Sequence, residues 1–143
     1  SDYLRRRNFT TNLLELLGEE QRYWVAQMIW CAIHADHRVD QREYKYVETI
    51  LQLIEHDPLR FQQLCQLDSQ VPFPSIIGLD QKLRKEIYRY IVEIMMIDDK
   101  YTEEEASFVR DVGQQLGYDA HERDKVIQPV ASAQMIRKIH FQH

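Results

Sequence analysis

Cysteine is scarce in this sequence, which contains only Cys31 and Cys65 among its 143 residues. Two isolated cysteines argue against a disulfide framework and against a zinc knuckle built from paired thiols. Both lie in apolar helical patterns, so we interpret them as reduced thiols of the core. This use of cysteine favours the cytosol as the compartment.

Long apolar runs are missing as well. No stretch approaches the roughly 20 apolar residues that cross a bilayer, and residues 1–12 have no signal-peptide core. Three consecutive arginines, Arg5 to Arg7, could contact anionic lipid. We therefore expect membrane contact only if the native chain extends beyond these ends.

The chain also lacks a surplus of positive charge. The sequence contains 18 Lys and Arg residues and 23 Asp and Glu residues, which gives a net charge of −5. Neutralisation of phosphates needs a basic face, so we exclude nucleic acid as a partner.

Familiar catalytic motifs are missing too. The sequence has no Gly-rich phosphate loop, nucleophile elbow, zinc-protease helix or paired-cysteine motif, so we expect no enzymatic activity. The weakest of our hypotheses is hydrolysis at a metal-bound water, which would require two acidic loops to converge in space.

Apolar residues recur at helical spacing instead, and β-branched residues nowhere alternate with polar ones. The sequence predicts an all-α fold, a bundle of about seven to eight helices in one domain spanning 1–143. The expected helices cover 9–17, 19–35, 41–54, 58–67, 81–97 and 102–116, followed by a short helix capped by Asp119 and a last one over 129–140. Gly18 is expected at a left-handed helix end, and the proline-bearing segment 71–74 is expected as a connector.

The most informative feature is a duplication with an offset of 62 residues, as from Val25 to Ile87. In the first helix of each copy, Val25, Ile29, Ala32 and Ile33 recur as Ile87, Ile91, Ile94 and Met95. In the loop and second helix, Asp36, Glu43, Val47, Ile50 and Ile54 recur as Asp98, Glu105, Val109, Val112 and Leu116. The sequence thus predicts two related helical hairpins, over about 24–54 and 86–116.

One position breaks the correspondence, because Gly113 stands where the first copy has Leu51. A glycine inside a helix costs about 1 kcal/mol relative to alanine. We expect the close approach of a neighbouring helix to offset that cost.

Each hairpin contains an acidic loop, and helix capping explains some of its acidic residues. Asp40 with Glu43, and Thr102 with Glu105, have the spacing of a capping box. Asp36 and Asp98 are not explained in this way, because each follows a helix end, where the dipole disfavours a carboxylate. Either each Asp accepts hydrogen bonds from amides of its own turn, or it joins the following Glu in holding a hard cation such as Ca²⁺ or Mg²⁺.

This pattern of Asp, an apolar residue and a Glu between two amphipathic helices, present twice and opened by Ala-Asp in the first copy, resembles the TerB-like family of tellurite-resistance and stress-associated proteins. The resemblance covers about 24–116. The position after each Asp, usually glycine in that family, is His37 and Asp99 here.

The resemblance implies a cytosolic or membrane-peripheral helical domain, without an established reaction, whose acidic residues bind a divalent cation. By position, the candidate ligands are Asp36, Asp40, Glu43, Asp98, Thr102 and Glu105, with Asp99 as an additional acid.

Two functional hypotheses follow. The first is a stress-associated binding or regulatory module that holds a divalent cation in its acidic loops. The second is a protein-interaction domain, with another protein as its partner, in which the loops are purely structural. A lesser alternative places Zn²⁺ or Ni²⁺ on His34 and His37, although a histidine at a helix C-terminus is also explained by the dipole.

Overall fold

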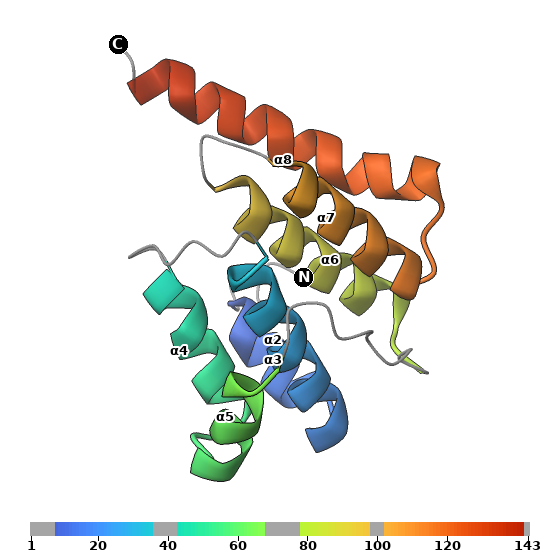
Figure 1. The fold of residues 1–143 in the computed structure, drawn as a ribbon. Helices are drawn as coiled ribbons and strands as arrows, with labels where there is room; N and C mark the ends of the chain where they lie inside the picture. Colours follow the sequence, from blue (N-terminus) through green and yellow to red (C-terminus); the bar gives the residue numbers. More distant parts are fainter. Residues whose placement is uncertain (1–7, 36–42, 68–77, 98–101, 142–143) are drawn as a thin grey trace. The chain divides into compact units, whose positions relative to one another are not determined.

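The computed structural model describes residues 8–35, 43–67, 78–97 and 102–141. These residues form seven helices and no strand, which confirms the all-α prediction for this part of the chain (Figure 1). The chain divides into two compact units, Ser1–Val71 and Pro72–His143, and each unit contains one copy of the duplicated segment. The boundary falls in the predicted proline-bearing connector, which itself lies outside the described residues.

The first unit contains α2 (Phe9–Leu16), α3 (Glu19–Ile33), α4 (Glu43–Leu53) and α5 (Pro58–Cys65). α4 packs against both α2 and α3. The predicted apolar positions of α3, Val25, Ile29, Ala32 and Ile33, are all buried. Ile50 of α4 and Ile54, which directly follows α4, are buried as well, whereas Val47 is half-buried.

Two predictions about this unit are wrong. Gly18 is not in the left-handed region: its φ of −71° and ψ of 169° make it the extended N-cap of α3. The side chain of Gln21 folds back there, and its Oε1 accepts a hydrogen bond from the amide of Gly18 at 3.1 Å. Because Leu17 is also extended, the chain passes from α2 to α3 without a left-handed residue.

The second wrong prediction concerns Cys65, which is exposed, whereas Cys31 is buried as expected. The short α5 buries only Leu64, so the next residue along the helix, Cys65, points away from the core. The start of α5 agrees with the sequence, because Asp57 caps it and Pro58 occupies its first position.

The second unit contains α6 (Gln81–Met96), α7 (Glu103–Gln115) and α8 (Ala120–Phe141). α6 packs against both α7 and α8. The second-copy positions Ile87, Ile91, Ile94 and Met95 are buried, as are Val109, Val112 and Leu116. The Asp80 cap, the Thr102 cap and the turn at Gly117, whose φ is +87°, also match the predicted helix boundaries.

The end of the chain corrects the predicted pair of helices, because α8 is one helix that continues through Pro129 (Figure 1). A proline inside a helix removes one backbone hydrogen bond and costs about 3 kcal/mol. Val126 and Val130 lie one helical turn apart on either side of Pro129, and both are buried. Their burial, on a helix that packs against α6, offsets the cost of the proline.

Gly113 is closely approached, as predicted. A Cβ atom at this position would lie 2.5 Å from Cδ of Arg123 and 2.9 Å from the hydroxyl oxygen of Tyr88. That hydroxyl is buried and donates to the carbonyl of Val109 at 3.0 Å. Side chains from α6 and α8 thus occupy the space that any larger residue at 113 would need.

No helix of the described segments combines the length and the apolar character needed to cross a bilayer.

Candidate functional site

Four residues of the predicted acidic site, Asp36, Asp40, Asp98 and Asp99, lie outside the described residues. Glu43 begins α4, but its side chain is likewise outside the described part. The structure therefore reports on Thr102 and Glu105 alone.

Thr102 and Glu105 form the predicted capping box at the start of α7. The Thr102 hydroxyl oxygen accepts from the amide of Glu105 at 3.1 Å, and Glu105 Oε1 accepts from the amide of Thr102 at 3.1 Å. The Thr102 hydroxyl also donates to Glu105 Oε1 at 3.1 Å. Glu105 is only 4% exposed, and this network satisfies one oxygen of its buried carboxylate.

The helices that precede the acidic loops end within two residues of the predicted positions. α6 ends at Met96 with Ile97 as its C-cap, so Asp98 directly follows a negative helix end. α3 ends at Ile33 with His34 as its C-cap. Among the described residues, no three His, Cys, Asp or Glu side chains come close enough to hold a metal ion together.

His34 is held locally. Its Nδ1 lies 2.8 Å from the carbonyl oxygen of Trp30, and its ring centroid lies 4.3 Å from that of Trp30. His37, the proposed second ligand for Zn²⁺ or Ni²⁺, is outside the described residues.

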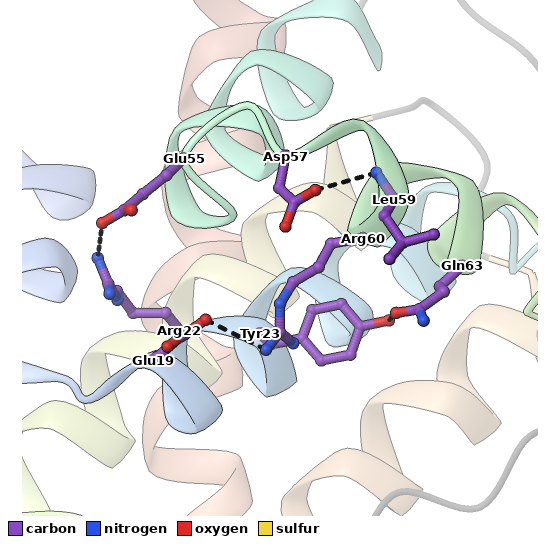
Figure 2. Close-up of polar contacts among 8 residues, drawn as sticks. All are labelled: Glu19, Arg22, Tyr23, Glu55, Asp57, Leu59, Arg60 and Gln63. Atoms are coloured by element: carbon purple, nitrogen blue, oxygen red, sulfur yellow. Dashed lines mark hydrogen bonds and ion pairs between the residues drawn. The ribbon is translucent and has the colours of Figure 1, made fainter.

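A polar pocket in the first unit was missed by the sequence analysis. It has a volume of about 260 Å³ and lies between the start of α3, the end of α4 and the start of α5. Figure 2 shows α5 and the turn before it directing side chains toward those of α3. The lining residues are Glu19, Arg22, Tyr23, Leu53, Ile54, Glu55, Asp57 and Arg60.

Arg22, from α3, is the most enclosed charged group of this pocket. Its side chain is 16% exposed, and its Nη1 forms an ion pair with Glu55 Oε1 at 2.9 Å. Its Nε is buried and has no hydrogen-bond partner among the described residues. Within the described part of the chain, this guanidinium is held by a single carboxylate, that of Glu55, which is 70% exposed.

Arg60, from α5, lies on the other side of the pocket (Figure 2). Its Nη2 is 3.3 Å from Glu19 Oε1, and its guanidinium carbon is 4.4 Å from the centroid of the Tyr23 ring. That distance permits a cation–π interaction. The Tyr23 hydroxyl donates to Gln63 Oε1 at 3.4 Å, which ties the ring to α5.

The turn between α4 and α5 brings the remaining charges to the pocket. Glu55 and His56 both have a φ of 56°, a left-handed conformation that is unusual for residues other than glycine. The amide of His56 donates to the carbonyl of Leu51 at 2.8 Å, which closes the end of α4. Asp57 follows, and its Oδ1 accepts from the amide of Leu59 at 3.0 Å.

The charges of the pocket are mixed. Glu19, Glu55 and Asp57 contribute three carboxylates, whereas Arg22 and Arg60 contribute two guanidinium groups, so the lining has a formal charge of −1. Such a lining can interact with negative and positive groups at the same time.

A scan against protein-family models, a search of curated proteins and a search of solved structures each gave no match for this chain. The TerB-like resemblance therefore stays a prediction, and it depends on the residues of the two acidic loops.

Proposed function

We propose that this chain is a non-enzymatic, stress-associated binding module of the TerB-like kind, which holds a divalent cation in its acidic interhelical loops. Ca²⁺ and Mg²⁺ are the favoured ions, because both prefer oxygen ligands. The cytosol is the proposed compartment. The ligands come from Asp36, Asp40 and Glu43 in the first unit and from Asp98 and Asp99 in the second.

The observation that supports this proposal is the position of the second acidic loop between two helix ends. Asp98 follows the negative end of α6, and the first turn of α7 adds Glu103, Glu104 and Glu105. So many carboxylates within one short segment repel each other unless a cation is present. A bound cation would relieve both that repulsion and the unfavourable position of Asp98.

Thr102 and Glu105 have a supporting role in this proposal. The Thr102 hydroxyl and Glu105 Oε1 are already engaged with each other and with backbone amides. We therefore assign them to fixing the first turn of α7, which leaves direct coordination in the second loop to Asp98 and Asp99.

The test is a thermal melt of metal-stripped protein with added Ca²⁺, Mg²⁺, Mn²⁺ or Zn²⁺. A cation that binds only the folded state stabilises it by about 2.7 kcal/mol at 100 times its Kd. We expect a saturable rise of Tm with Ca²⁺ or Mg²⁺ that is lost in Asp98→Asn. Asp111→Asn is the matched control, because Asp111 is an exposed residue of α7 and should leave the rise unchanged.

The second candidate function is protein interaction with purely structural loops. Two exposed apolar neighbours on α8 favour it, Met135 at 65% and Ile136 at 66% exposure. Adjacent exposed apolar side chains are common where one protein binds another. If no ion raises Tm, and Asp98→Asn only changes the melting of the free protein, this function replaces cation binding.

A further inference from the structure

We propose that the pocket of the first unit binds a small zwitterion, a compound that has a carboxylate and an ammonium group on a short apolar frame. The proposal uses none of the residues assigned to the cation. It depends on the position of Arg22 in the lining, the mixed charge of that lining and the size of the pocket.

Arg22 is the carboxylate-binding group. Glu55 engages only Nη1 of its guanidinium, and Nε has no hydrogen-bond partner among the described residues. A planar guanidinium binds a carboxylate best through two parallel hydrogen bonds. A ligand carboxylate in the pocket would pair with the two outer amino groups of Arg22, Nη1 and Nη2, in place of Glu55.

The competing contact of Arg22 is easily replaced. Its partner Glu55 is 70% exposed, and ion pairs with such solvated groups contribute little to stability. Glu19, which contacts Arg60, is 73% exposed and is equally free to turn into water. Both arginines are therefore available to a ligand without the loss of a buried interaction.

The carboxylates of the lining select against a simple anion. A ligand with negative charge alone would approach Glu19, Glu55 and Asp57, and like charges at this range repel each other. An ammonium group on the same ligand turns that repulsion into attraction. The mixed lining thus favours a ligand with both charges over one with either charge alone.

The size and the apolar part of the pocket limit the ligand further. Its volume of about 260 Å³ corresponds to roughly nine water molecules, at about 30 Å³ each. Leu53 and Ile54 contribute the apolar part of the lining. A free amino acid with an aliphatic side chain matches this volume and this chemistry.

The experiment uses three probes that differ by one charged group each. L-Leucine is the zwitterion, 4-methylpentanoate lacks the ammonium group, and 3-methylbutylamine lacks the carboxylate. Binding is followed by ¹⁵N-resolved NMR of the full chain, through the Nε–H signal of Arg22 and the backbone amides of Tyr23 and Arg60. We expect leucine to shift these signals saturably and to bind at least tenfold more tightly than either single-charge probe.

Variants test the role of Arg22. Arg22→Gln should abolish the leucine response while far-UV circular dichroism shows that the helices remain. Arg89→Gln is the matched control: Arg89 forms an exposed ion pair with Glu93 on α6, so its loss should leave leucine binding unchanged. Should Arg22→Gln fail to fold, the comparison of the three probes on the unmodified chain still decides the question.

Three results would overturn the proposal. They are no shift with leucine, equal binding of leucine and 4-methylpentanoate, and leucine binding that survives in a folded Arg22→Gln variant. The first excludes a zwitterion site, the second assigns the pocket to simple carboxylates, and the third removes Arg22 from the site.

Discussion

Replacement of Gly113 by alanine should destabilise the second unit, although alanine is the better helix former. At an unhindered helix position this exchange gains about 1 kcal/mol. At 113 the added Cβ would lie 2.5 Å and 2.8 Å from Cδ and Cγ of Arg123, and 2.9 Å from the hydroxyl oxygen of Tyr88. All three distances are shorter than Cβ contacts in folded proteins, so a neighbour must move.

The two neighbours differ in how freely they move. Arg123 can change its rotamer, but its Nη1 then loses the 2.9 Å hydrogen bond to the carbonyl of Tyr118. Tyr88 is fully buried, and its displacement would leave the Val109 carbonyl without its hydroxyl partner, at about 1–3 kcal/mol. Overpacking of a core costs about 1–3 kcal/mol. After subtraction of the helix gain, we expect Gly113→Ala to lower the free energy of unfolding by about 2 kcal/mol.

The assay is urea denaturation followed by far-UV circular dichroism. Gln114, the exposed next residue of α7, provides the control, because Gln114→Ala should be about 1 kcal/mol more stable than Gln114→Gly. In an Arg123→Ala background two of the three short contacts are gone, so Gly113→Ala should cost about 1 kcal/mol less. If Gly113→Ala stabilises the protein as much as the change from glycine to alanine at 114, steric exclusion at this position is refuted.

Two further predictions concern the second unit. Thr102→Ala should lower the free energy of unfolding by about 1 kcal/mol, because the capping box is lost, whereas Thr102→Ser should retain it; urea denaturation of both variants distinguishes them. Burial raises the pKa of Tyr118 above its usual 10.0, and Glu122 adds to the rise while Arg84 opposes it. Above about pH 10 the unfolded chain therefore loses this proton first, and stability falls as the pH rises toward the folded pKa. Denaturation between pH 9 and 11 should show a shallower fall in Tyr118→Phe, and equal slopes would contradict the assignment.

The core could be predicted from the sequence because it repeats a local pattern. Apolar residues at helical spacing must share one face of their helix, and both copies place that face at the same positions. For this reason, equivalent positions are buried in the two units, as Val25 and Ile87 are, and as Ile29 and Ile91 are. The Thr102–Glu105 box was equally predictable, because its chemistry lies within four residues of the chain.

Features that depend on tertiary packing were not predictable. Whether Pro129 ends a helix depends on how much apolar surface the continuing helix buries, and Val126 and Val130 reveal that only in the folded unit. Cys65 has an apolar neighbourhood in the sequence, but only Leu64 of α5 reaches the core. A periodic pattern identifies an apolar face without showing which neighbour covers it.

The pocket was missed for a related reason. Arg22 and Glu55 are 33 residues apart, and Glu19 and Arg60 are 41 apart, so no local motif joins them. The turn that unites them adopts left-handed conformations at Glu55 and His56 without a glycine to indicate them. In a sequence, charged residues at the start of a helix suggest a solvated surface. That the charged residues of α3, α5 and the turn before α5 meet in one pocket follows only from the packing of these helices.

One tertiary contact can nevertheless be inferred from the duplication itself. With the offset of 62, Ala26 corresponds to Tyr88, and Leu51 corresponds to Gly113. The second copy thus gains bulk on its first helix and loses bulk on its second. Opposite changes of size preserve packing only where the two side chains share one space, because a well-packed core tolerates exchanges that conserve volume. In the second unit, the Tyr88 hydroxyl lies 2.9 Å from the position of a Cβ at 113, so Tyr88 occupies space that a larger residue at this position of α7 would need.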